Sequence, residues 1–191
     1  MSLRVVLADD EAVIRMGLRT MLEEKGYRVV GEAGDGQRAI DLAQMLRPDL
    51  VFLDIKMPGL DGLAAAEVLV AEHRVPVILL TAYGDRALID RARAAGVMAY
   101  LVKPLRESDL VPAVEMALAR FRDLLALAGE VSDLREALET RRLVERAKGV
   151  LMQRLGVSEE EAYLRIQRAS RDGRRPMREV AAQVLAGENP P

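Results

Sequence analysis

Leu50-Val51-Phe52-Leu53-Asp54 is the stretch of sequence that decides the fold. Its four apolar residues stand in a row shortly after Pro48, a pattern typical of a strand that is buried on both faces. The run ends at a carboxylate, and Lys56-Met57-Pro58-Gly59 follows as a turn. Because ligands of open parallel sheets bind at the carboxyl ends of the strands, Asp54 is a candidate site residue. A strand-end aspartate that only caps the next turn would show the same pattern.

The segments on either side of this stretch alternate between short strands and helices. Besides residues 50–54, the sequence predicts strands at residues 4–8, 28–33, 77–80 and 99–102. Asp35 and Asp61 are expected to cap the helices that follow them. A further helix is expected to start at Asp85 and to end at Gly96. Five βα units in succession predict an α/β fold: a doubly wound, five-stranded parallel sheet in the flavodoxin-like order 2-1-3-4-5.

Polar side chains stand at the carboxyl ends of four predicted strands: Asp9 and Asp10, then Asp54, Thr81 and Lys103. In the expected strand order these ends share one edge of the sheet, so the side chains converge. Burying unpaired carboxylates is costly, and a hard divalent cation such as Mg²⁺ relieves their repulsion. Asp54 would then be a nucleophile toward a phosphoryl group, with Lys103 and Thr81 contacting phosphoryl oxygens. Taken singly, each residue also fits a purely structural role, as a helix cap, a strand residue or a surface turn.

Composition limits the classes of protein to which this chain can belong. It has 191 residues, of which 50% are hydrophobic, and no cysteine, so disulfides and thiolate metal sites are excluded. The apolar run Leu3–Ala8 is too short for a signal peptide, and no apolar run approaches the roughly 18 residues of a membrane span, so a cytoplasmic protein is expected. Residues 1–129 hold 16 basic and 19 acidic side chains, whereas residues 141–178 hold 11 basic and 5 acidic. This asymmetry suggests two domains with different partners.

Residues 1 to about 125 resemble a response-regulator receiver domain. They are similar to the chemotaxis regulator, which is a receiver domain alone. The resemblance is carried by Asp9-Asp10, Asp54 with Met57-Pro58-Gly59 and Asp61-Gly62, Thr81-Ala82, and Lys103-Pro104. It implies a receiver domain at residues 1–122, in which a sensor histidine kinase phosphorylates Asp54.

The same resemblance implies roles for further residues. Mg²⁺ would be held by Asp10, Asp54 and the backbone carbonyl of Lys56, with Asp9 in an indirect role. Tyr100 would be the aromatic switch residue that reports phosphorylation together with Thr81. The Lys103–Pro104 peptide bond would be cis.

Residues 123–140 are predicted to be a helical linker. Apolar residues recur there at a three-four spacing that defines a short heptad seam: Leu124, Leu127, Val131, Leu134 and Leu138. A coiled coil that makes a homodimer, a helix that couples the two domains, and a helix packed on its own domain all fit this pattern. Gly129 weakens the helix by about 1 kcal/mol relative to alanine, so a break there also stays open. Pro112 falls near the start of the helix expected from Ser108, where it need not break it.

Residues 141–187 show three short helical patterns, which predict a small three-helix all-α domain, and residues 188–191 are expected to fray. Gly156 is expected to end the first helix, Ser158 to cap the second and Pro176 to start the third. The excess of basic residues is the charge pattern expected for binding a phosphate backbone, although a solvated helix surface explains part of it. We find neither a helix-turn-helix spacing nor an aromatic sheet platform in this region.

Three segments of this region resemble the ANTAR output domain of antitermination regulators: Leu138–Arg141, Ala147–Met152 and Ser158–Tyr163. The resemblance covers about residues 130–187 and implies a dimeric three-helix domain that binds paired short RNA hairpins in nascent transcripts. The residues expected to face RNA are Lys148, Arg154, Tyr163, Arg171, Arg174 and Arg175.

The sequence thus predicts a two-component response regulator in which phosphorylation of Asp54 controls an RNA-binding antitermination output. A DNA-binding response regulator, and a signalling protein whose helices dock a protein partner, remain alternatives. The last 60 or so residues hold no nucleophile–base pair, metal cluster or phosphate-binding loop, so an enzymatic output is not expected.

Overall fold

The structure is a computed structural model that describes residues 2–82, 91–92 and 95–187. The chain divides into two compact units, Met1–Leu124 and Leu125–Pro191. We describe each unit by itself, because the positions of the two relative to one another are not determined. In the part of the chain that is described, no helix is long and apolar enough to cross a membrane.

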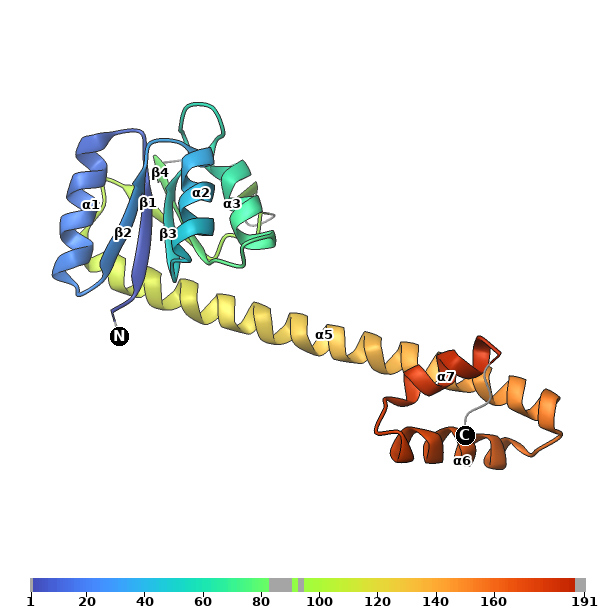
Figure 1. Ribbon diagram of the computed structural model, residues 1–191. Coiled ribbons are helices and arrows are strands. Elements are labelled where there is room, and N and C mark those ends of the chain that lie inside the picture. The colour runs from blue at the N-terminus through green and yellow to red at the C-terminus, as the bar shows by residue number, and fades with distance from the viewer. Residues whose placement is uncertain (1, 83–90, 93–94, 188–191) are drawn as a thin grey trace. The chain divides into compact units, whose positions relative to one another are not determined.

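The first unit is built on a parallel sheet of five short strands (Figure 1). The strands are β1 (Arg4–Ala8), β2 (Arg28–Ala33), β3 (Leu50–Asp54), β4 (Val77–Ala82) and β5 (Ala99–Lys103). Their order is β2-β1-β3-β4-β5, which confirms the predicted flavodoxin-like topology. β3 lies at the centre, and all five of its residues are buried, as its continuous apolar sequence predicts.

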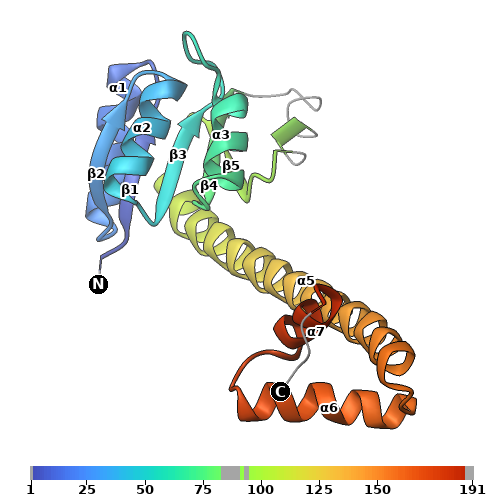
Figure 2. The ribbon, with the colours of Figure 1, turned by 45° about the vertical axis from the view of Figure 1, so that its right-hand side comes forward.

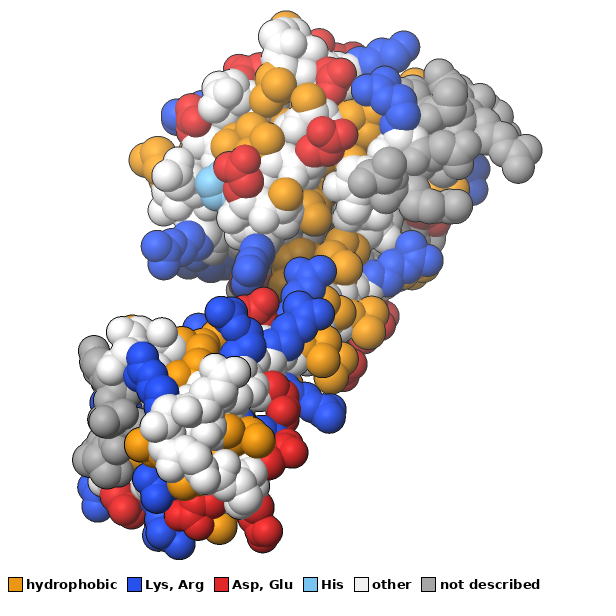
Figure 3. All heavy atoms as spheres, turned by 90° about the vertical axis from the view of Figure 1, so that its right-hand side faces the viewer, with side chains coloured by type: hydrophobic (Ala, Val, Ile, Leu, Met, Phe, Trp, Pro, Cys, Tyr) orange, Lys and Arg blue, Asp and Glu red, His pale blue; other side chains and the backbone are white. Residues whose placement is uncertain are grey.

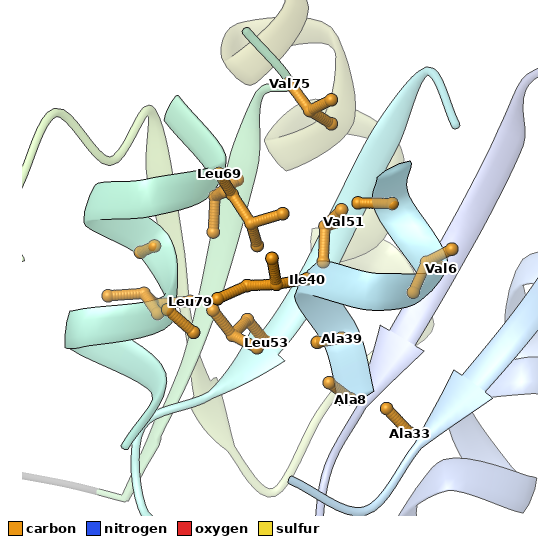
Figure 4. Packing of buried hydrophobic residues seen from close by; sticks show 14 of the residues in the cluster. Val6, Ala8, Ala33, Ala39, Ile40, Val51, Leu53, Leu69, Val75 and Leu79 are labelled. Atoms are coloured by element: carbon orange, nitrogen blue, oxygen red, sulfur yellow. The ribbon is translucent and has the colours of Figure 1, made fainter. Parts of the chain in front are cut away.

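Helices cover both faces of this sheet. α2 (Gly36–Leu46) and α3 (Gly62–Ala71) pack on one face, which Figure 2 shows turned toward the viewer. Alternate strand residues such as Val51 and Leu53 meet Ile40 and Leu69 there (Figure 4). α1 (Ala12–Glu24) and the first part of α5 (Glu107–Leu155) pack on the other face, with Phe52 at the centre of that core. The helix expected between Asp85 and Gly96 falls largely outside the described residues.

Two aspartates fix where helices begin, as predicted. The Asp35 side chain accepts a hydrogen bond from the Arg38 backbone N–H at 2.8 Å, and Asp61 accepts one from Ala64 at the same distance. Gly62, the first residue of α3, follows Asp61 directly. A Cβ atom at Gly62 would lie 1.9 Å from the Asp54 carbonyl oxygen, so only glycine lets α3 start against the end of β3.

α5 is one continuous helix of 49 residues that begins in the first unit and ends in the second. The break that the sequence left open at Gly129 does not occur. A single glycine costs a helix only about 1 kcal/mol, which the neighbouring turns offset. Pro112 lies inside the second turn of α5 without ending the helix, as expected near a helix start.

The second unit is a small helical bundle. The last four turns of α5 pack with α6 (Glu159–Asp172) and α7 (Met177–Leu185). Gly156 follows α5 with a φ of +62°, and the Ser158 hydroxyl accepts a hydrogen bond from the Glu161 backbone N–H at 3.2 Å. The core of the bundle is small and aliphatic: Val144, Ala147, Leu151, Ala162, Ile166, Ala169, Val180, Ala181 and Val184.

Candidate functional site

The carboxyl edge of the sheet brings Asp9, Asp54 and Lys103 into direct contact. The Lys103 Nζ atom lies 2.7 Å from Asp9 Oδ2 and 3.0 Å from Asp54 Oδ1. Asp9 and Asp54 are 1% and 6% exposed, respectively, so both carboxylates are almost fully removed from solvent. The parallel topology produces this arrangement, because β1 and β3 are neighbours and β5 reaches the same edge.

Asp10 adds a third carboxylate to this cluster. One carboxylate oxygen from each of Asp9, Asp10 and Asp54 lies within 4.8 Å of the others. Asp10 is exposed, whereas the other two are buried, so the cluster opens to solvent on one side. Lys103 supplies a single positive charge against three negative ones. An all-oxygen donor set with an excess of negative charge and an open side fits a hard divalent cation such as Mg²⁺.

Burial and charge act against each other on the two central groups. Burial raises the pKa of Asp54, the charge of Asp9 raises it further, and the hydrogen bond and charge of Lys103 oppose the increase. For Lys103, burial lowers the pKa, but the hydrogen bonds and charges of Asp9 and Asp54 outweigh burial and the pKa is raised. Lys103 therefore stays charged at neutral pH, ready to contact an anionic group bound beside Asp54.

Arg15 supports this cluster from α1, and the sequence analysis did not identify it. The Arg15 Nη1 atom donates a hydrogen bond to the Asp9 backbone carbonyl. Its Nε atom lies 3.6 Å from Glu32 Oε2 on β2, and Arg19 contacts the same carboxylate at 2.9 Å. Arg15 therefore ties the acidic loop after β1 to the neighbouring strand. The only available signal was the helical spacing of Arg15 and Arg19 on one face of α1.

The other predicted receiver residues lie near the same edge but do not all contact the cluster. Thr81 lies on β4, and its hydroxyl donates to the Ala82 carbonyl at 3.0 Å rather than to Asp54. Tyr100 on β5 is 49% exposed. The Lys103–Pro104 bond is cis, as the resemblance implied.

Lys56 lines an open pocket of about 490 Å³ that also contains Asp10. The other residues of this pocket are Ile55, Met57, Asp61, Leu63 and Arg91. Asp10 is the one residue of the acidic cluster among the lining residues, so the pocket adjoins the cluster at its exposed side.

The six residues predicted to face RNA are placed very differently. Arg154, Arg171 and Arg174 are exposed, and Arg174 has a left-handed φ of +48° in the turn after α6. Arg175 is half-buried and donates to Gln183 Oε1 at 3.0 Å. Tyr163 is 40% exposed on α6.

Lys148 is the residue whose placement argues against its predicted role. It is 8% exposed, and its Nζ atom lies 2.9 Å from Glu145 and 2.6 Å from Glu159. The ammonium thus joins α5 to the first turn of α6 and is not presented to solvent. The one-dimensional sequence gave no sign of this, because Glu159 is eleven residues away across the turn at Gly156.

Comparisons with known proteins match each of the two units to a known domain family. The profile of the family "Response regulator receiver domain" matches residues 5–115, and that of the "ANTAR domain" matches residues 132–185. The chain is 54% identical over 182 residues to the transcriptional regulatory protein PdtaR of Mycobacterium tuberculosis, covering 95% of this chain and 89% of that protein.

Two further relatives match the first unit. The chemotaxis protein CheY of Thermotoga maritima is 36% identical over 115 residues, which are 60% of this chain and 96% of CheY. The crystal structure of the signal receiver domain of a modulated diguanylate cyclase from Desulfovibrio desulfuricans G20 has a TM-score of 0.60 and 32% identity, and covers 64% of this chain and 98% of that one.

Proposed function

This chain belongs to the two-component response regulators, as a receiver domain joined to an ANTAR domain, and we propose that phosphorylation of Asp54 controls its binding to RNA. The observation that carries the proposal is the cluster of Asp9, Asp10 and Asp54 around Lys103. We keep the domain limits expected from the sequence, with the receiver at residues 1–122, the linker at 123–140 and the output domain at 141–187.

The chemistry of the receiver follows from the position of Asp54 at the end of β3. One carboxylate oxygen of Asp54 attacks the phosphorus atom of the donor, and the bond from phosphorus to the donor's nitrogen or oxygen breaks as the new P–O bond forms. Lys103 is placed to pair with a phosphoryl oxygen, because its ammonium already lies 3.0 Å from Asp54. Thr81 can contact a second phosphoryl oxygen after its hydroxyl rotates away from the Ala82 carbonyl. We propose a sensor histidine kinase as the donor.

The charge of the cluster supports a requirement for a divalent cation. Asp10, Asp54 and the Lys56 backbone carbonyl would hold Mg²⁺. Asp9 would act indirectly, through its place in the cluster and its ion pair with Lys103. The cation would supply charge neutralisation for the incoming phosphoryl group. Arg15 keeps the loop that carries Asp9 and Asp10 in place through its bond to the Asp9 carbonyl.

The output is supported by the exposed arginines of the second unit and by the ANTAR match at residues 132–185. Exposed Arg154, Arg171 and Arg174 suit contacts to RNA phosphates. We withdraw Lys148 from the set of RNA-facing residues, because two carboxylates already hold its ammonium, and propose that it positions α6 on α5.

The seam residues of α5 support a homodimer as the form that binds RNA. Leu124, Leu127, Val131, Leu134 and Leu138 are 44–65% exposed, so this apolar row has no partner in the described part of one chain. A second copy of the same helix would cover it in a parallel coiled coil. Tyr100 and Thr81 would transmit the phosphorylated state toward this helix.

The experiment that tests the proposed function measures RNA affinity before and after phosphorylation. RNA that copurifies with the protein after treatment with acetyl phosphate and Mg²⁺ is sequenced, and one recovered hairpin is used as the probe. We expect the affinity of wild-type protein for this hairpin to rise on phosphorylation and to fall steeply with salt. Asp54→Asn should show the unphosphorylated affinity under all conditions. Equal affinities with and without phosphorylation, or a preference for duplex DNA, would refute the proposal.

A further inference from the structure

The second unit contains a groove of about 640 Å³ between α5, Tyr163 of α6 and the start of α7. Its volume is within the range of small-ligand sites. The residues that line it come from all three helices: Asp133, Glu136, Ala137, Thr140, Arg141, Val144, Glu145, Tyr163, Pro176, Met177 and Arg178. Figure 3 shows orange hydrophobic side chains among blue and red ones on the visible face of this unit.

The floor of the groove is apolar. Val144 is 6% exposed and belongs to the bundle core, and Met177 packs against that core. Tyr163 is 40% exposed and also lines the groove, so part of its side chain is accessible to a ligand there. Tyrosine is the only aromatic residue type in the second unit, and this position is its only occurrence there.

The charges on the rim largely cancel. Arg178 contacts Glu136 across the groove at 2.7 Å, and Glu145 is paired with Lys148 at 2.9 Å. Within the described residues, Arg141 is exposed and forms neither an ion pair nor a side-chain hydrogen bond. The lining therefore presents an apolar floor, one aromatic ring, and two charged side chains without an ion pair among the described residues, the guanidinium of Arg141 and the carboxylate of Asp133.

We propose that this groove receives a single unstacked base of the bound RNA, with the base lying on Tyr163 and its edge beside Arg141. The inference rests on the RNA-binding function proposed above and adds where on the output domain a base is held. RNA loops are recognised through splayed bases that stack on aromatic rings and hydrogen-bond to arginines, which is the chemistry that this lining offers.

The surroundings of the groove favour RNA over another occupant. Pro176 lines the groove, and the exposed Arg174 precedes it by two residues in the same turn. Arg171, the second-last residue of α6, is 79% exposed at its side chain, and its ion pair with the similarly exposed Asp172 at 3.4 Å is screened by water. A neutral base on the apolar floor and phosphates at these arginines would therefore match the charge pattern on both sides of the turn.

The test uses the full-length phosphorylated protein and a hairpin RNA selected from a pool with a randomised loop. A set of the same hairpin with one abasic nucleotide at each loop position measures the contribution of each base. We expect Tyr163→Ala to lower affinity roughly tenfold, because stacking of one base on an aromatic ring is lost, and Tyr163→Phe to bind like wild type. Arg141→Ala should also weaken binding, and the adjacent, exposed Arg142→Ala, which lies outside the groove lining, should cost less.

The decisive result is non-additivity. One abasic position should weaken binding to wild-type protein about tenfold but have little further effect on Tyr163→Ala, because the two changes remove the same contact. Full additivity at every loop position would overturn the proposal, as would wild-type affinity of both Tyr163→Ala and Arg141→Ala. A change in self-association with unchanged RNA affinity would show that the groove contacts protein instead. If the pool yields no bound hairpin, the proposed function fails, and the groove proposal fails with it.

Discussion

Each of the two units contains one lysine held between two carboxylates, and the two arrangements have almost the same distances. Lys103 lies 2.7 and 3.0 Å from Asp9 and Asp54, and Lys148 lies 2.9 and 2.6 Å from Glu145 and Glu159. The burial of the acids is what differs. The side chains of Asp9 and Asp54 are 2% and 8% exposed, whereas those of Glu145 and Glu159 are 55% and 67% exposed.

This difference teaches that equal geometry does not imply equal chemistry. Water screens the glutamates around Lys148, so this contact serves to hold α6 against α5. The aspartates around Lys103 are shielded from water, so their repulsion is costly unless cations oppose it, and Lys103 supplies one of these charges. On the function proposed above, the shielded cluster of the receiver is the reactive site, and the exposed contact of the output domain is a structural one.

The largest expected effect is that of removing the buried lysine. Lys103→Met should lower the free energy of unfolding of the receiver by about 3 kcal/mol at pH 7 without Mg²⁺, because two buried carboxylates lose their cation. Hydrogen exchange of the β1 and β3 amides reports this loss for the receiver alone. Lys25→Met is the matched control, since Lys25 forms an exposed pair with Glu107 at 3.3 Å and should cost less than about 1 kcal/mol. Equal losses of unfolding free energy in Lys103→Met and Lys25→Met would contradict the claim that burial of the carboxylates makes the Lys103 contact different from an exposed ion pair.

An intermediate effect is expected from the divalent cation. At a Mg²⁺ concentration tenfold above its dissociation constant, the wild-type receiver should gain about 1.4 kcal/mol of stability. Asp10→Asn should lose most of this gain, because it removes one of the three carboxylates of the cluster. Asp123→Asn, at an exposed position on α5, is the control and should keep it. Thermal unfolding at increasing Mg²⁺ concentrations measures the gain, and an undiminished response of Asp10→Asn would exclude Asp10 as a ligand.

The smallest effect is expected for Lys148→Met in the second unit, and it should depend on pH. The hydrogen bond and charge of Lys148 lower the pKa of Glu159. The pair therefore stabilises the fold fully at pH values above the ordinary glutamate pKa of about 4.3. This stabilisation is lost as the pH falls through the lower pKa that Glu159 has in the folded protein. Hydrogen bonds to Glu145 and Glu159 raise the pKa of Lys148, so its contribution lasts until strongly alkaline pH. The difference in melting temperature between wild type and Lys148→Met should therefore be present at pH 7 and small at pH 3. An equal difference at both values would show that packing, not charge, is what Lys148 supplies.

The fold of the receiver could be predicted from the sequence because short local patterns specify its strands and helix starts. The apolar run Leu50–Leu53 defined a buried strand, and Asp35 and Asp61 marked helix starts by a capping rule that acts over three residues. Once five such units were recognised, the strand order followed from general topology, and with it the convergence of Asp9, Asp54 and Lys103.

Contacts between distant side chains could not be predicted in this way. The bond from Arg15 to the Asp9 carbonyl and the pairing of Lys148 with Glu159 depend on how elements pack, which no periodic pattern encodes. The need for glycine at position 62 also arises from packing, since the Asp54 carbonyl occupies the space of a side chain. In the output domain, basic composition indicated nucleic acid, but only the folded helices separated the exposed Arg171 from the buried Lys148.

The central claim is that the buried acidic cluster lets Asp54 accept a phosphoryl group with the help of a divalent cation. The most direct test is the intact mass of the protein after incubation with acetyl phosphate, with Mg²⁺ or with a chelator. We predict one phosphoryl adduct on wild-type protein in Mg²⁺, very little in the chelator, and none on Asp54→Asn. An adduct that persists on Asp54→Asn, or that forms equally well without a divalent cation, would contradict the account.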